Sequence, residues 1–266
     1  TGGRAWGIAI SGHYAYVTNE QDAGSNTGSL RIFDLAAPDS PRMMGSVGIP
    51  SRDVLDVAVS GQYAYVAACL DGLQVVDVTD VRSPRVIGAV TTPACIGVVA
   101  VSDGHAFVGS LEGMHVVDIS DPHSPRMVAT LPLRHGYGGI AVSGKYAYAG
   151  SSGFYVIDVS IPTVPRVVGG IDSDGASAFA LSGSRAYLAD WDAGLRIAAR
   201  QCDVVRVSVQ DFRLQGSGSS VRIHWRSPES TEAGFLLRAK NGSCAWTVPH
   251  ALLDAYTFTA TDDSPN

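Results

Sequence analysis

The sequence predicts an all-β protein, a β-propeller built from four-stranded antiparallel blades. A stretch such as GLQVVDVTDVRSPR (residues 72–85) recurs three more times, and a shortened fifth copy, GLRIAAR, ends at Arg200. The aspartate of this stretch returns after every 40 to 43 residues, which is the period of a four-stranded propeller blade. Shorter repeats are typical of β-solenoids. The recurring aspartates are Asp34, Asp77, Asp118 and Asp158.

The second unit shows most clearly why four strands are expected in each repeat. Its strand-forming segments are Val57–Val59, Tyr63–Ala67, Leu73–Val78 and Arg85–Val90, and Gly, Pro, Ser and Asp lie between them. A four-stranded meander of this size cannot cover both of its own faces. The units must therefore pack on one another.

Two further patterns favour tightly packed blades. In Tyr63-Ala64-Tyr65-Val66 and its copies, the rings are expected on one face of the strand and the small residues on the other. A Ser-Gly pair, such as Ser60-Gly61, lies between the first and second strand-forming segments and predicts a hairpin whose turn needs a positive φ. In the third unit, Asp103-Gly104 takes the place of this pair. Proline-bounded turns end the third strand of most units and start the fourth.

Composition excludes several classes of protein. The chain has 266 residues, a net charge of -6 and only two lysines, so nothing supports a nucleic-acid partner. It has no apolar run long enough for a transmembrane helix, so no membrane span is expected. The sequence has no initiating Met and no leader, as expected for a processed chain or a fragment. Four cysteines are compatible with an oxidising compartment.

Together these motifs resemble a known family. An Ala-Val-Ser-Gly-x-Tyr-Ala-Tyr-Val hairpin followed by Gly-Leu-x-Val-Val-Asp-Val-Ser-Asp-Pro-x-x-Pro-Arg is similar to the LVIVD repeat of bacterial and archaeal surface or secreted proteins. The resemblance covers about residues 4–200. It implies a β-propeller in an extracellular or cell-envelope setting. Because the sequence starts without a Met, the propeller is expected either to consist of these five units or to have further blades at its N-terminal side. It brings no catalytic motif that can be transferred to residues of this chain.

The repeat pattern stops after Arg200, which predicts a propeller over residues 1–202 and a second module over 206–266. Alternating Val221, Ile223 and Trp225 resemble a strand of a fibronectin type III-like sandwich. A complete sandwich needs about 100 residues. The second module is therefore expected to be partial.

The repeated charged residues are expected to be structural. A reaction centre is needed once, whereas the aspartates recur in four units, so we expect each carboxylate to accept N-H groups of the turn that follows it. The arginines at the end of each stretch are expected to brace neighbouring blades or line one rim. They are Arg42, Arg85, Arg126 and Arg166.

Binding residues are expected where the units differ. In a meander, the loops between the second and third strands and the connections between blades emerge on one face, and that rim carries the irregular residues. The candidate binding residues on this rim are Arg52, Asp53, Arg134, His135, Tyr137, Asp174, Asp190, Trp191 and Asp192.

Each candidate cluster has two interpretations. Trp191 between two carboxylates could stack on a sugar ring or anchor a protein, or it could cover the last blade. Arg134, His135 and Tyr137 could hold an anion or be solvated. Four aspartates could attract Ca²⁺ if their loops converge, although no calcium-loop spacing is present and no cofactor is expected. They are Asp172, Asp174, Asp190 and Asp192.

Cys69 and Cys95 are both predicted on this rim, in consecutive loops. They are expected either to form a disulfide or to remain two unpaired thiols. Cys202 and Cys244 lie in different segments and are not expected to pair.

No catalytic residue is predicted. The chain lacks His-Glu-x-x-His, Gly-x-Ser-x-Gly, a glycine-rich phosphate loop and zinc-type cysteine spacing. The sequence therefore predicts a non-catalytic extracellular or cell-surface scaffold that binds an unidentified protein or glycan. The alternative is a polysaccharide hydrolase or lyase with a carboxylate pair drawn from Asp53, Asp174, Asp190 and Asp192.

Overall fold

The computed structural model is all-β, with every assigned element of its described part a strand. It describes residues 4–20, 27–133, 138–151, 153–171, 176–183, 185–190, 194–199, 210–217, 220–226, 236–238, 245–247 and 258–261. Contacts divide the chain into two units, Thr1–Gln201 and Cys202–Asn266. Among the described residues, no helix is long and apolar enough to cross a membrane.

The first unit contains five blades, each a meander in which sequential strands are antiparallel neighbours. Blade 1 consists of β1 (Ala5–Ser11), β2 (Tyr14–Asn19), β3 (Gly28–Asp34) and β4 (Arg42–Ile49). Blade 2 consists of β5 (Asp56–Ser60), β6 (Tyr63–Ala67), β7 (Leu73–Asp77) and β8 (Arg85–Val90). Blade 3 consists of β9 (Ile96–Ser102), β10 (His105–Ser110), β11 (Gly113–Asp118) and β12 (Arg126–Pro132). Blade 4 consists of β13 (Gly139–Ser143), β14 (Tyr146–Ser151), β15 (Gly153–Asp158) and β16 (Arg166–Ile171). Blade 5 has three strands in the described residues, β17 (Ala176–Ser182), β18 (Arg185–Asp190) and β19 (Gly194–Ala199).

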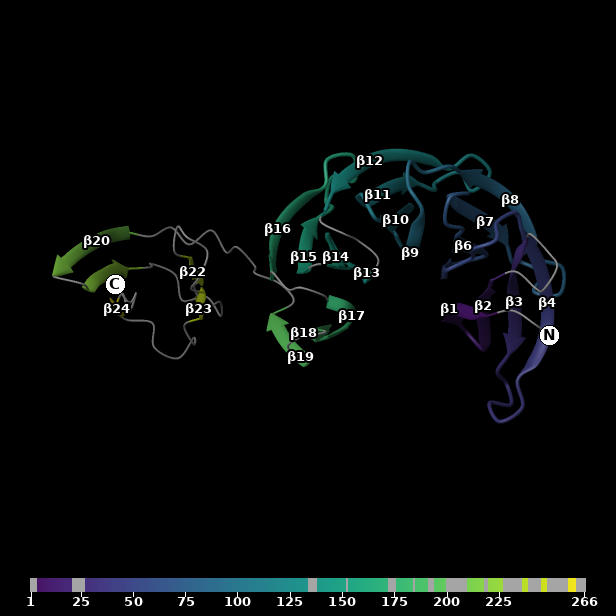
Figure 1. Ribbon diagram of the computed structural model, residues 1–266, viewed down its shortest axis with the longest axis horizontal. Coiled ribbons are helices and arrows are strands. Elements are labelled where there is room, and N and C mark those ends of the chain that lie inside the picture. The colour runs from purple at the N-terminus through teal and green to yellow at the C-terminus, as the bar shows by residue number, and fades with distance from the viewer. Residues whose placement is uncertain are drawn as a thin grey trace. The chain divides into compact units, whose positions relative to one another are not determined.

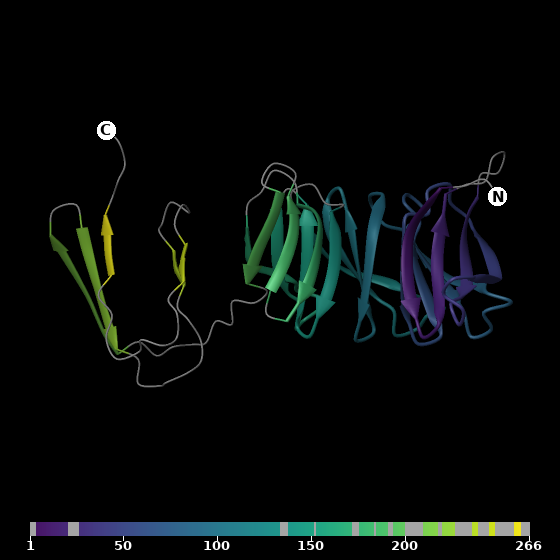
Figure 2. The same ribbon diagram turned by 90° about the horizontal axis from the view of Figure 1, so that it is seen from below.

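The blades stand side by side with their first strands on the inside and their fourth strands on the outside (Figure 1). The inner strand β5 contacts both β1 and β9, and β9 contacts β13. All blade strands run between two ends of the unit, where the turns and connections gather (Figure 2). The blades form an open, propeller-like series in which the sheets do not close into a ring (Figure 1).

Each blade has two apolar faces, which we name by their neighbours. The leading face packs on the following blade, and in blade 2 it carries Tyr65, Leu73 and Val75, which share a core with Val99 of blade 3. The trailing face packs on the preceding blade. In blade 2 it carries Val57, Ala64, Val66 and Val76, which share a core with residues of blade 1.

The tyrosine pattern explains this two-sided packing. Tyr65 lies in the core with blade 3, whereas the adjacent Ala64 lies in the core with blade 1. The expected separation of large and small residues is therefore confirmed. A small residue on one face leaves room for the ring of the neighbouring blade.

The hairpin turns between first and second strands have the backbone that their glycines predict. Gly12, Gly61, Gly144 and Gly183 have φ between 54° and 60°. In blade 3 both central residues are in this region, Asp103 at 47° and Gly104 at 71°. A positive φ at both positions matches the twist of a two-residue hairpin.

The recurring aspartates form the turn bonds that were expected of them. Asp77 Oδ1 accepts the N-H of Thr79 at 2.9 Å, and Asp118 Oδ1 accepts that of Ser120 at 3.0 Å. Asp34 and Asp158 accept the N-H groups of Ala36 and Ser160 in the same way. In four blades, this carboxylate fixes the start of the turn to the fourth strand.

Two of the recurring arginines form ion pairs within their own blade and do not brace a neighbouring blade, which was one of the two expectations. Arg85 pairs with Asp77 at 3.4 Å and Arg126 with Asp118 at 3.7 Å, each within one blade. The strands β7 and β8 place Asp77 directly opposite Arg85, which brings the charges together inside the sheet. Both arginines are largely exposed, so these pairs contribute little stability.

Glycines allow blades 1 and 2 to touch through their backbones at two points. A Cβ atom on Gly7 of β1 would lie 2.6 Å from the Cα atom of Asp56. On the outer strand β4, a Cβ atom on Gly45 would clash with the carbonyl oxygen of Val81. Gly88 of blade 2 meets the carbonyl of Pro122 in blade 3 in the same way.

The second unit contains two small sheets in its described part. One consists of β20 (Gln210–Ser217), β21 (Ser220–Arg226) and β24 (Phe258–Thr261) in the order β20-β21-β24. The other pairs β22 (Leu236–Arg238) with β23 (Ala245–Thr247). Val221, Ile223 and Trp225 lie in β21 as expected, but these strands give no support for a fibronectin type III-like module.

Candidate functional site

The candidate site is one end of the first unit, which we call the variable rim. It comprises the loops between second and third strands and the connections between blades. The described segments that we use are the β4–β5 connection (residues 50–55), the β6–β7 loop (68–72), the β8–β9 connection (91–95) and the β10–β11 turn (111–112). Because the strands alternate in direction, all four segments leave their sheets at the same end.

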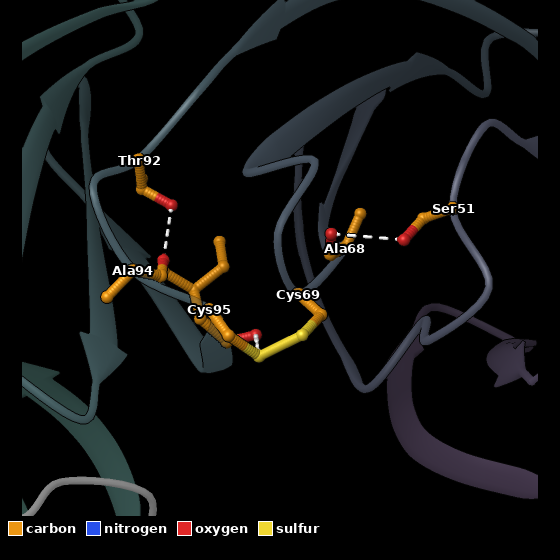
Figure 3. The surroundings of a disulfide bond; sticks show 7 residues. Ser51, Ala68, Cys69, Thr92, Ala94 and Cys95 are labelled. Carbon is orange, nitrogen blue, oxygen red and sulfur yellow. Dashed lines mark hydrogen bonds between the residues drawn. A yellow bond between two sulfur atoms is a disulfide. The ribbon is translucent and has the colours of Figure 1, made fainter.

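A disulfide joins two of these segments. Cys69 in the β6–β7 loop is bonded to Cys95 in the β8–β9 connection (Figure 3). The N-H of Ile96 also donates to the carbonyl of Cys69 at 3.2 Å, so a backbone bridge accompanies the covalent bond. Of the two alternatives for these cysteines, the structure has the disulfide. It ties a loop of blade 2 to the entry of blade 3.

Hydrogen bonds extend this fixed region on both sides (Figure 3). The buried hydroxyl of Ser51, in the β4–β5 connection, donates to the carbonyl of Ala68 at 3.2 Å. The hydroxyl of Thr92 donates to the carbonyl of Ala94 at 2.8 Å, next to the disulfide. The connection from blade 1, the loop of blade 2 and the connection to blade 3 therefore form one linked segment of the rim.

Two leucines are exposed at the tips of rim loops in neighbouring blades. Leu70 is 73% exposed and Leu111 is 57% exposed. Each is followed by an acidic residue and a glycine, Asp71-Gly72 and Glu112-Gly113. Gly72 and Gly113 have φ of 74° and 137°, which favours glycine and makes a tight return into the third strand. The rim thus presents an apolar side chain beside a carboxylate twice.

A buried histidine supports the β10–β11 turn from below. His115 is fully buried, with Ser110 Oγ 2.8 Å from its Nε2 and Thr130 Oγ1 3.0 Å from its Nδ1. Ser110 also accepts the N-H of Glu112, which holds the acidic residue of the rim turn. Burial lowers the pKa of His115, against a smaller opposing effect of Glu112, and thereby favours the neutral imidazole. Sealed from solvent, this Ser-His pair holds the turn in place.

Asp56 lies where three inner strands meet, at the rim end of β5. Its Oδ2 accepts the N-H of Val99 in β9 and its Oδ1 accepts the N-H of Val57, both at 2.9 Å. Burial raises the pKa of the Asp56 carboxyl, and the two backbone hydrogen bonds oppose that shift. Both oxygens have backbone partners, so Asp56 joins blades 2 and 3.

Sequence reasoning missed Asp56, although a signal was present. Aligning the inner strands places Gly7, Val98, Gly139 and Ala178 at the same position. Asp56 is the one charged residue among these five. His115 was missed for a different reason, because nothing in a single histidine indicates whether it is buried.

The structure describes only some of the predicted rim residues. Arg52 and Asp53 are exposed and adjacent on the β4–β5 connection, on the variable rim as expected. Asp190 ends β18, but its side chain lies outside the described part. The remaining candidates also lie outside the described residues. They are Arg134, His135, Tyr137, Asp174, Trp191 and Asp192.

The calcium hypothesis rests on those same undescribed loops, since Asp172, Asp174 and Asp192 fall there. Within the described ranges, no group of three or more His, Cys, Asp or Glu side chains is arranged to hold a metal ion.

Comparison with protein families matches the blades one by one. The LVIVD repeat matches residues 2–48, 51–92, 97–131, 138–173 and 175–198. This chain belongs to the LVIVD repeat family. The five LVIVD matches correspond to blades 1 to 5, and they end before the second unit. No curated protein matches the sequence.

One solved structure shares the fold at low identity, and a second is similar over part of the chain. The LVIVD chain is similar to the computationally designed Ika8 protein, with a TM-score of 0.57 and 12% identity, over 92% of this chain and 71% of that chain. The designed Ika4 protein matches with a TM-score of 0.46 and 11% identity, over 62% of this chain and 89% of that chain. The likeness to Ika8 concerns the fold alone.

Proposed function

We propose that this LVIVD-repeat protein is a non-catalytic binding scaffold of the extracellular space or cell envelope, and that its variable rim contacts a partner. The observation that carries the proposal is the pair of exposed leucines, Leu70 and Leu111, on neighbouring loops of one rim. Exposed apolar residues on ordered loops are typical anchors of protein interfaces. Their aliphatic character favours a protein partner over a glycan, which aromatic rings bind better.

The order of the rim supports the same function. The Cys69–Cys95 disulfide and the Ser51 hydrogen bond hold consecutive segments together before any partner arrives. A loop that is already ordered loses little conformational entropy on binding. A disulfide in a small repeat domain is also typical of oxidising compartments, which supports a secreted or surface location.

The alternative function from the sequence, a polysaccharide hydrolase or lyase, requires two carboxylates that face each other. Of its four candidates, Asp53 is the one whose side chain lies in the described part, so no pair defines a separation. This alternative stays a prediction, as does the fibronectin type III-like nature of the second unit.

The test is binding of the labelled chain to an array of cell-envelope proteins and glycans. We expect a protein on the array to bind the wild type, and the double variant Leu70→Asp/Leu111→Asp to bind it at least about tenfold more weakly. The matched control is Ile161→Asp/Val164→Asp, because these residues are 54% and 56% exposed in the β15–β16 turn at the opposite end of the blade.

Equal loss of binding in both double variants would contradict a role for the rim. Turnover of a polysaccharide on the array, without stable binding of any partner, would favour the enzyme instead.

A further inference from the structure

The leading face of blade 5 exposes residues that are buried in every other blade. Leu195 of β19 is 70% exposed, whereas the corresponding third-strand residues are at most 1% exposed. Those residues are Leu30, Leu73, Met114 and Phe154. Ile197, two residues further along β19, is 54% exposed, and its four counterparts are all buried. Blade 5 therefore presents the leading half of an inter-blade interface to solvent.

The trailing face of blade 1 is exposed in the same way. Ile8 of β1 pairs with Val17 as Val57 of blade 2 pairs with Val66, so the two first-strand residues correspond. Ile8 is 64% exposed and Val57 only 4%. Ile10, on the same face as Ile8, is 66% exposed, and Met43 of β4 is 60% exposed. Blade 1 therefore presents the trailing half of an inter-blade interface.

The two exposed faces are complementary, because the molecule joins a leading face to a trailing face four times. The cores between blades 1 and 2, 2 and 3, 3 and 4, and 4 and 5 each combine third-strand residues of one blade with residues from the trailing face of the next. Nowhere in these four cores do two leading or two trailing faces meet.

We propose that the leading face of blade 5 in one molecule binds the trailing face of blade 1 in a second copy of this chain. The contact reproduces the four interfaces already made within the molecule, with Leu195 and Ile197 on one side and Ile8 and Ile10 on the other. It is a heterologous, head-to-tail contact, which closes into a ring if the rotation between copies permits and continues as an open assembly if it does not. This inference is independent of the proposed rim function.

The test measures the mass of the full 266-residue chain by sedimentation across a dilution series. We expect the wild type to form oligomers that dissociate on dilution. Ile8→Lys and Ile197→Lys each place a charge on one of the two faces, and each variant alone is expected to be monomeric. Mixing the two variants should restore a dimer, because one copy retains its blade 5 face and the other its blade 1 face.

The matched control is Ile161→Lys, which replaces an isoleucine that is as exposed as Ile197, at 54%, but lies in the β15–β16 turn. This variant should oligomerise like the wild type, and circular dichroism should show that all three variants keep their sheets. A monomeric wild type overturns the proposal. Oligomers that survive both single substitutions, or a mixture that stays monomeric, overturn it as well.

Discussion

In blades 1 to 4, a single aspartate marks where the chain turns from the third to the fourth strand. The pKa of Asp118 is lowered by hydrogen bonds from the side chain and the backbone N-H of Ser120, and more weakly by nearby positive charges. Asp77 and Asp158 have lowered pKa values for the same main reason, through Thr79 and Ser160. The ionised carboxylate is thus part of the folded turn.

Replacing one of these carboxylates should weaken the fold measurably. Asp118→Ala leaves the N-H of Ser120 without its partner, so we expect the free energy of unfolding to fall by roughly 1 kcal/mol at neutral pH. Urea denaturation measures the change, with Asp39→Ala, an exposed carboxylate in the equivalent turn of blade 1, as the control. Because the pKa of Asp118 is lowered on folding, its contribution is present above the ordinary value of 3.8 and is lost as pH falls through the folded value. Equal effects of the two substitutions would contradict this role.

The buried His115 should make stability depend on pH in a different range. Burial lowers its pKa from the ordinary value of 6.5, so the unfolded chain binds a proton at a pH where the folded chain does not. We therefore expect the free energy of unfolding to decrease as pH falls through and below about 6.5. His115→Gln, which copies Gln74 at the equivalent position of blade 2, should reduce this dependence in urea titrations at several pH values. An unchanged slope in the variant would show that another group is responsible.

At the scale of the strand and the loop, local sequence determined most of what could be predicted. The expected segment Arg85–Val90 is β8, and Tyr63–Ala67 is β6, because glycine and proline mark their ends. The register shift between third and fourth strands, which recurs in blades 1 to 4, was not predicted. Each shift inserts one extra residue into the fourth strand, and the alternation of apolar and polar residues in that strand does not mark it.

The site was predicted less completely than the strands, for related reasons. The rim followed from topology, and the loops of Cys69 and Cys95 could be placed side by side from the order of strands alone. Asp56 is held by Val99, a residue 43 positions away in blade 3, and His115 is held by hydroxyl groups of β10 and β12 on either side of its own strand. Residue type alone indicated neither contact. The exposed Leu70 and Leu111 were missed because an apolar residue in a strand-rich sequence is usually interpreted as core.

The disulfide is a loop-level feature with a measurable effect. Cys69 and Cys95 are separated by 26 residues, and a loop of that size predicts stabilisation of roughly 3 kcal/mol from the reduced entropy of the unfolded chain. Cys69→Ser/Cys95→Ser should lower the free energy of unfolding by about that amount. The reduced wild type should match the double variant in the same urea experiment. A large remaining difference between them would mean that the serines, rather than the missing bond, cause the loss.

For the whole molecule, stability should fall toward the ends of the series of blades. Blades 2 and 3 are packed on both faces and share a large core, whereas blade 5 exposes Leu195 and Ile197. In a linear array, each unit contacts only its nearest neighbours, so a unit with one neighbour has one stabilising interface fewer. At a dilution where the chain is monomeric, hydrogen exchange should therefore show the slowest amide exchange in β6, β7, β10 and β11 and faster exchange in β18 and β19. Equal protection in all blades of the monomer would contradict this gradient.

The glycine contacts between blades 1 and 2 have a mechanical consequence. Gly7 brings the backbones together near the axis, and Gly45 does so at the periphery. Because the two backbones are in contact at the inner and at the outer edge, the angle between blades 1 and 2 is fixed at both edges. Gly7→Ala would push the inner strands of the two blades apart, and Gly45→Ala would push the outer strand of blade 1 away from blade 2. The curvature of the series of blades therefore depends on these two glycines. The same curvature determines how many blades a closed ring would need.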